Sequence, residues 1–313
     1  MINEILDVIF TANFFQSSVR LAIPLILACM GGVLAERSGV LLMSLESMML
    51  MGALSGFTGA YFSGSPWIGL LTAILGALIF GLIHAFTTVS LGVSQVVVSV
   101  ALNILGTGLT SSLFFIIFGN QTNQLRSVGF EKITIPVLSK IPILGPAIFD
   151  QTIIGYIAFL LIPLTWWFLF KTTIGLKIRS VGEYPKAAET MGVKVLRLRF
   201  LCVLYASVLA GVGGAAISIT GLNTFIPNLT AGRGFIAFAA IIFGKYNPLG
   251  AAAGALLFGF TDCLQLNIQS LGINIPYQFP LMLPYVITLI VLFMVGAGGA
   301  PKSSGTPYFP DGE

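Results

Sequence analysis

The chain has 313 residues, of which 56% are hydrophobic and only 8% are charged, and its mean hydropathy is +0.98. This composition excludes a soluble globular domain and predicts an all-α, polytopic membrane protein. The net charge of +4 does not indicate nucleic-acid binding, because the Lys and Arg residues concentrate in one loop that lacks interleaved aromatic residues.

Several kinds of chemistry have no residues to support them. Cys29, Cys202 and Cys263 lie in apolar stretches without metal-ligand spacing, and the single histidine, His84, is expected to be a hydrogen-bonded packing residue. The sequence contains no P-loop, so we expect no nucleotide site, no metal, no cofactor and no catalytic residue in this chain. No Lys or Arg precedes Arg20, so a cleavable signal peptide is not expected.

The expected elements follow from the need for about 20 apolar residues per crossing. Residues 1–14 are amphipathic and too short to span, and we expect them to lie in the membrane interface. The seventh span is short, which suggests a broken or half-crossing helix. We treat residues 1–313 as one transmembrane domain with nine spans, at 16–35, 40–62, 67–90, 93–118, 152–170, 200–220, 232–244, 248–266 and 278–297.

Orientation follows from the basic loop, residues 171–199, which holds seven of the fifteen Lys and Arg residues and is therefore placed in the cytoplasm. Counting spans from it places Glu36–Gly39 inside and the long segment 119–151 outside, with structure of its own. The tail 299–313 falls inside, and its Gly, Pro and Ser content predicts that it is unpacked.

The basic loop carries a helix signal. Pro185 suits a first helical position, and Gly192 can end the helix in a left-handed conformation. Between them, Ala187, Ala188 and Met191 are good helix formers that share a face. We therefore expect a short helix that presents a small apolar knob to a docking partner.

The fourth span carries a stripe of polar residues spaced four apart, namely Gln95, Ser99, Asn103, Thr107 and Ser111. A polar stripe in lipid must face protein or water. Two interpretations stay open: hydrogen bonds between helices, or one wall of a hydrophilic path.

Glu46 in the second span also needs an explanation, because an unpaired carboxylate there costs about 2.5–3.5 kcal/mol. We weigh an ion pair with Arg37 or Arg20 against a role in substrate passage or gating, and Asp262 allows the same two readings. The stretch 232–250 is read as close helix packing or as a broken helix lining a pore.

Five stretches occur in an order that identifies a family. They are LAERSGVLLMSLESMMLMGA at 34–53, QVVVSVALNILGTGLT at 95–110, GLKIRSVGEYPKAAETMGV at 175–193, GFIAFAAIIFGKYNPLGA at 234–251 and APKSSGTPY at 300–308. Over nearly its whole length the chain resembles the permease subunits of bacterial ABC importers for nucleosides, within the group that also serves ribose, other simple sugars and branched-chain amino acids. Where that family usually has Gly-Leu-Glu-Gly, this chain has serine at positions 44 and 47.

The resemblance implies a fold like that of the vitamin B12-type (type II-like) importers, with up to ten spans, in the bacterial cell membrane. It implies a homologous second permease as heterodimer partner, ATPase subunits that bind the ATP, and a lipoprotein that delivers substrate from outside. It also matches the segment 182–192 to the coupling helix, which contacts the ATPase through Gly182, Glu183, Tyr184, Pro185, Ala187, Ala188, Met191 and Gly192.

We therefore predict a subunit that forms half of a translocation path for nucleosides. The path residues are expected to be Glu46, Gln95, Ser99, Asn103 and Thr107, and the lipoprotein is expected to meet Arg126, Lys132 and Lys140. The alternatives are a permease for a simple sugar or riboflavin, an ion-coupled secondary transporter using Glu46 and Asp262, and a scaffold whose partner carries the path. An intramembrane enzyme would need a nucleophile–base pair or a set of metal ligands, and the sequence shows neither.

Overall fold

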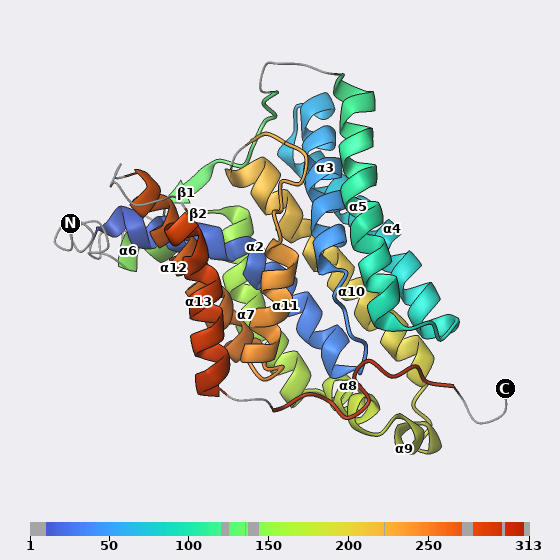
Figure 1. Ribbon diagram of the computed structural model, residues 1–313. Helices are drawn as coiled ribbons and strands as arrows, with labels where there is room; N and C mark the ends of the chain where they lie inside the picture. Colours follow the sequence, from blue (N-terminus) through green and yellow to red (C-terminus); the bar gives the residue numbers. More distant parts are fainter. Residues whose placement is uncertain are drawn as a thin grey trace.

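The computed structural model describes residues 11–119, 125–134, 136, 144–221, 223–270, 278–295 and 298–309 (Figure 1). Within them the regular secondary structure is helical except for one short strand pair. The longer elements are α2 (Ala12–Arg37), α3 (Leu45–Ser63), α4 (Pro66–Ala85), α5 (Gln95–Phe118), α7 (Ile153–Lys171), α10 (Val195–Ala216), α12 (Pro248–Ser270) and α13 (Gln278–Val295). The shorter ones are α6 (Leu144–Phe149), α8 (Thr173–Glu183), α9 (Pro185–Thr190), α11 (Arg233–Phe243), the strands β1 (Lys132–Thr134) and β2 (Asp150–Thr152), and the π-helical turns η1 (Phe86–Ser90) and η3 (Ile217–Gly221).

Each of the nine predicted spans contains one of these helices. In the part of the chain that is described, six helices are long and apolar enough to cross a membrane: α2, α4 with η1, α5, α7, α10 with η3, and α12. The helix α3 is not among them, and α11 is short, as the sequence predicted. The protein is thus an all-α polytopic membrane protein apart from the strand pair.

The helices α2, α3 and α10 form the centre of the bundle, and most of their side chains are buried. Small residues allow close contact between them. A methyl group added at Gly52 of α3 would lie 2.6 Å from the Cα atom of Gly211 in α10. Such backbone contact is how helices associate in lipid, where hydrophobic burial cannot drive them together.

The chain leaves helical conformation between α2 and α3, at residues 38–44. The predicted span at 40–62 therefore starts too early. Lipid cannot satisfy a non-helical backbone, so side chains from other segments must do so. The amide of Leu41 donates to Gln95 Oε1 (2.6 Å), that of Leu42 to Glu36 Oε1 (2.7 Å), that of Ser47 to Asn103 Oδ1 (3.1 Å), and Asn103 Nδ2 donates to the Met43 carbonyl (3.0 Å).

One end of the bundle carries the segment between α5 and α7. There β1 pairs with β2 in antiparallel register, with Ile133 opposite Gln151. Trp67, at the start of α4, meets Phe130 with ring centroids 5.0 Å apart. The described part of this loop thus has structure of its own. At the chain's start, residues 12–14 belong to α2 rather than to a separate interfacial segment, and residues 1–10 lie outside the described range.

The other end, which we call the basic-loop end, collects α8, α9, the end of α2 and the C-terminal tail (Figure 1). Arg37 Nε donates to the carbonyl of Tyr246 at 2.7 Å, which joins the end of α2 to the turn after α11. The segments that the sequence predicted to share one side therefore do meet.

The prediction of an unpacked tail is wrong for residues 301–308. Ser303 and Tyr308 are buried, and the Ser303 amide donates to the Gly182 carbonyl at 2.9 Å. The reason is Arg199, a buried guanidinium in the first turns of α10 that needs acceptors. It donates to the carbonyls of Ser38 (3.0 Å) and Thr306 (3.1 Å) and to Ser303 Oγ (2.9 Å).

Replacing Arg199 with Met should release the tail, because three hydrogen bonds from a charged group are lost together. We expect the protein in detergent to lose about 2–4 kcal/mol of unfolding free energy and a C-terminal tag to be cleaved faster by protease. Arg197→Met is the matched control, since Arg197 lies two residues away and is exposed. Equal protease sensitivity in the two variants would contradict this role.

Candidate functional site

The strongest candidate for a functional site is a groove of about 490 Å³ beside the middle of α5, which we call the polar groove. Four segments form it: the first turn of α3, the helix α5, the loop at residues 223–232 and the start of α11. Its lining residues are Glu46, Asn103, Ile104, Thr107, Gly108, Asn228, Gly232 and Phe235. The groove thus mixes uncharged polar groups with an aromatic ring and a single carboxylate.

The Glu46 carboxylate is fully engaged by the loop and by the N-terminus of α11. It accepts hydrogen bonds from Thr230 Oγ1 (2.5 Å), the Gly232 amide (2.9 Å) and the Gly234 amide (2.6 Å). A helix N-terminus offers unpaired N–H donors and a partial positive charge, so it stabilises a carboxylate there. Glu46 therefore caps α11 from a different helix.

This contact needs glycine at position 234. A methyl group added there would lie 2.4 Å from the backbone nitrogen and Cα of Glu46, so only glycine lets the two segments approach.

The predicted ion pair between Glu46 and Arg37 is wrong, because Arg37 donates to the carbonyls of Lys245 and Tyr246 at the basic-loop end. The small residues of 232–250 serve close packing, and α11 also borders the groove.

The loop before α11 holds backbone conformations that side chains rarely adopt. Asn228 and Ala231 have φ angles of 60° and 45°, and Asn223 has 52°. Such angles are uncommon outside glycine, though asparagine tolerates them best. The exposed side chain of Asn228 lines the groove. Sequence reasoning missed this residue, and the signal that could have found it is an asparagine in a short break between two apolar spans.

The predicted polar stripe on α5 divides between the two interpretations. Asn103 and Thr107 line the groove. Asn103 also hydrogen-bonds the backbone of residues 43 and 47 through both polar atoms of its side-chain amide. Gln95 and Ser99 do not reach the groove, because they are buried against the neighbouring helices. Gln95 instead accepts a hydrogen bond from the Leu41 amide. The stripe winds around α5, so only its middle faces the groove.

His84 is a hydrogen-bonded packing residue, as predicted. It is buried, and its Nδ1 atom lies 2.9 Å from the Ser44 hydroxyl. The serine at position 44, where the resembled family usually has glycine, thus serves a contact within the fold.

The second candidate site is the exposed surface of the basic loop. The helix α9 begins at Pro185, and Gly192 follows it with a φ of 80°, so the predicted start and stop signals are confirmed. Ala188 was expected on an exposed knob, but it is 5% exposed and packs in a cluster with Val181, Val195 and Tyr308. The most exposed large apolar side chain of the loop is Met191, which is 83% exposed.

The tail holds this loop in place through several contacts. Lys302 Nζ hydrogen-bonds the hydroxyl of Tyr184, and this bond raises the pKa of Lys302 above its usual value. The Tyr308 hydroxyl donates to the carboxylate of Glu189 in α9. The loop and tail therefore form one unit that is joined to α2 and α10 through Arg199.

Two of the three residues predicted to meet the lipoprotein are described, and both belong to the opposite end. Arg126 and Lys132 are exposed there, beside Phe130 and β1, and Lys140 lies outside the described residues. Asp262 lines a separate cavity of about 250 Å³ together with Arg233, so it does not contribute to the polar groove.

The fold and these sites define a class of protein: a polytopic membrane protein with a polar groove beside the middle of one spanning helix and a well-packed basic loop at one end. The chain belongs to the family described as the branched-chain amino acid transport system / permease component, whose model matches residues 14–295.

Three relatives are similar over most of their length. The guanosine ABC transporter permease protein NupQ of Bacillus subtilis is 38% identical over 97% of both chains. The nucleoside ABC transporter permease protein NupC of Lactococcus lactis is 40% identical over 91% of this chain and 93% of its own. A putative glucose ABC transporter permease protein of Haloferax volcanii is 38% identical over 90% and 86%.

Replacing Glu46 with Gln should destabilise α11, because the side-chain NH₂ group would then face backbone N–H donors. An unsatisfied buried donor costs about 1–3 kcal/mol, and hydrogen exchange at residues 232–236 should speed up accordingly. Thr230→Val is the comparison variant, since it removes one donor and keeps both amide bonds, so its effect should be smaller. An unchanged exchange rate in Glu46→Gln would show that the carboxylate is not the cap.

Proposed function

We propose that this protein is the membrane-spanning subunit of an ATP-driven importer for nucleosides in the bacterial cell membrane. The observation that carries the proposal is the polar groove, which lies beside the middle of α5 and offers Asn103, Thr107 and Asn228 to a solute. Two of the three relatives named above are permeases for guanosine or nucleosides.

The groove suits a neutral solute with hydroxyl groups and a flat base. Its one carboxylate already accepts three hydrogen bonds from the loop and from α11, so it is held in a contact within the protein. Amide and hydroxyl groups can pair with ribose hydroxyls and base edges. Phe235 and Ile104 supply an apolar wall against which a base can stack. A simple sugar, as in the Haloferax relative's name, would use the polar groups but less of this wall.

The groove is open on one side, which supports a path shared with a second permease. Ile104 is 70% exposed, and Val97 and Val100 on the same helix are also exposed. A homologous partner packed against α5 would close the groove into a channel and exclude lipid from its polar groups. The overall arrangement would then be that of a heterodimer of the vitamin B12-importer type.

The basic loop is the proposed contact for the ATPase subunits, which bind the ATP. Met191 and Tyr184 are exposed next to α9, and Arg199 and the tail join the loop to the ends of α2 and α10. The helix α10 packs on α3, which carries Glu46. A push on α9 can therefore reach the groove through packed elements. The lipoprotein would dock at the opposite end, near Arg126 and Lys132.

Vesicles that contain the assembled importer should take up guanosine when supplied with ATP and not when supplied with an ion gradient alone. Excess nucleoside should compete with guanosine, whereas glucose and riboflavin should not. Uptake driven by an ion gradient without ATP would indicate a secondary transporter, and competition by glucose alone would indicate a sugar permease.

The same assay tests the groove through Asn228. Asn228→Gly removes the amide while allowing the left-handed backbone, and loss of one hydrogen bond of about 0.5–1.5 kcal/mol should lower uptake about two- to tenfold. Asn223→Gly makes the same change at a φ of 52° in the same loop but outside the groove. Equal losses in both variants would point to loop strain rather than to substrate contact.

Replacing Met191 with Arg should uncouple the importer, because it places a bulky charge in the proposed contact with the ATPase. Uptake should fall at least about tenfold, which corresponds to only about 1.4 kcal/mol of contact energy, while the amount of protein in the membrane stays constant. Met191→Leu, which keeps the apolar contact, should transport normally. Full uptake in Met191→Arg would show that Met191 does not contact the ATPase. Ala188 is unsuitable for this test because it is buried within the chain.

A further inference from the structure

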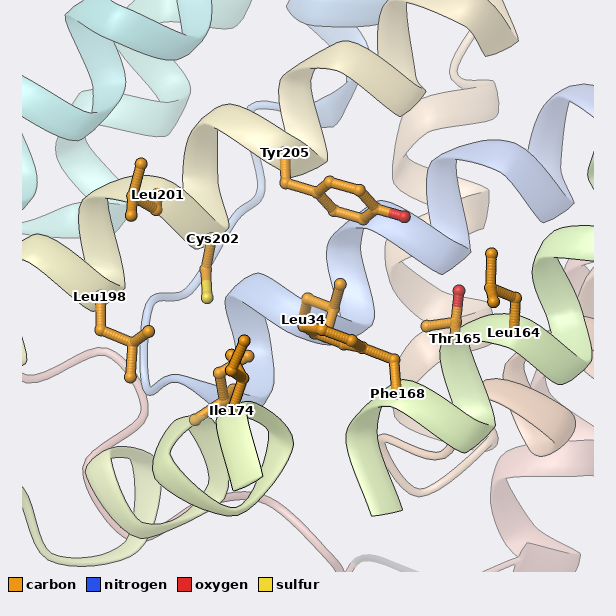
Figure 2. Close-up of a pocket in the computed structure, with 10 residues that line it drawn as sticks. Leu34, Leu164, Thr165, Phe168, Ile174, Leu198, Leu201, Cys202 and Tyr205 are labelled. Atoms are coloured by element: carbon orange, nitrogen blue, oxygen red, sulfur yellow. The ribbon is translucent and has the colours of Figure 1, made fainter. Parts of the chain in front are cut away.

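A second cavity, of about 400 Å³, lies near the basic-loop end, between α2, α7, α8 and α10 (Figure 2). Its walls are almost entirely apolar, formed by side chains such as Leu34, Phe168, Ile178 and Leu198. Figure 2 shows that Tyr205 and Thr165 lie together at one end of it. Its volume falls in the range of about 300–1,000 Å³ that is usual for ligand sites. The cavity is separate from the polar groove, and Ile174, Ile178 and Leu198 of the basic loop form part of its wall.

The cavity opens toward the outer surface of the helices. Leu164 of α7 and Leu201 of α10, which line it, are 49% and 52% exposed. Apolar side chains this exposed on spanning helices face either lipid or another subunit. The opening is one to two turns from the end of α7 at Lys171, so it lies close to the membrane boundary.

Three features place this boundary at the cavity. Trp166 and Trp167 lie in the last turns of α7, where the amphipathic ring of tryptophan favours the interface. Lys171 stands 5.9 Å from the centre of the Trp166 ring. The helix α8 exposes Ile174 and Leu176 next to basic residues, which is the pattern of a helix lying in the interface plane.

The rim of the cavity is positively charged. Lys171 ends α7, Lys177 lies one turn beyond Ile174 on α8, and Arg197 lies one turn before Leu201 on α10; all three are exposed. The one carboxylate on α8, Glu183, stands at its far end. Each Lys or Arg near an anionic lipid surface strengthens binding about fivefold. An apolar slot below a basic rim matches an acyl chain below a negatively charged headgroup.

We propose that this cavity binds one acyl chain of an anionic phospholipid, with the phosphate headgroup held by Lys171 and Lys177. The chain enters between α7 and α10, and its end approaches Tyr205 and Thr165. The bound lipid packs where α7 ends and α8, the first helix of the basic loop, begins. The proposal depends on the protein spanning a membrane and not on the identity of its transported solute.

The test compares lipid retention by the protein purified with whatever subunits accompany it. Intact-complex mass spectrometry after extraction, followed by titration with phosphatidylglycerol or phosphatidylcholine in nanodiscs, measures which lipid stays bound. The protein should retain phosphatidylglycerol. The double variant Lys171→Gln/Lys177→Gln should weaken this binding between about fivefold and 25-fold. Removing the same number of cations from the opposite end, in Arg126→Gln/Lys132→Gln, should leave it unchanged.

A cavity-filling variant separates the contribution of the apolar cavity to lipid binding from that of the basic rim. Leu198→Trp adds an indole to the cavity wall and should abolish retention of either lipid while both lysines remain. Equal binding of phosphatidylglycerol to this variant and to the wild type would overturn the proposal. So would a cross-link from a cysteine placed at Leu201 to a second permease, since the opening would then be covered by protein. If Leu198→Trp fails to fold, the double lysine variant and the cross-link decide the question.

Discussion

Each backbone N–H and C=O group that leaves a regular helix within a membrane needs a partner inside the protein, because lipid offers none. Two segments of this chain leave helical conformation between helices of the bundle, residues 38–44 and the loop at residues 223–232 before α11. Side chains from other helices satisfy both of them: Gln95, Glu36 and Asn103 serve the first, and Glu46 serves the second. Four polar side chains of the helices are used in this way.

The same contacts build the polar groove. When Glu46 caps α11, the short helix is held beside α3, and its first residues form one wall of the groove. Asn103 supports the start of α3 and also faces the groove, so it has a structural task as well as a proposed contact with substrate. Structural and transport roles are therefore difficult to separate at Asn103, whereas Asn228 allows them to be separated, because a glycine there keeps the backbone conformation.

The basic-loop end shows how a force on one surface can reach that groove. A buried guanidinium, Arg199, collects the end of α2, the tail and α10 around itself. The tail in turn holds the α8–α9 corner at Gly182. The cavity proposed to hold a lipid lies directly beside this unit and borders three of the same helices, α2, α8 and α10. An acyl chain in this cavity would pack against both α7 and α8 and so stabilise their relative position.

The sequence by itself determined the membrane class, the approximate place of every described span, the short helix in the basic loop and the family. These follow from hydropathy, from Pro185 and Gly192, and from ordered motifs, which are all local signals. Only the tertiary structure decided how buried polar groups pair, because a carboxylate or guanidinium finds its acceptors and donors across more than 100 positions of sequence. Glu46 thus meets the start of α11 rather than Arg37, and Arg199 draws in a tail whose composition had suggested no packing. The same holds for the direction in which the α5 side chains point. The spacing predicted a polar stripe that must face protein or water, and the neighbouring helices decide that Gln95 and Ser99 are buried while Thr107 lines the groove.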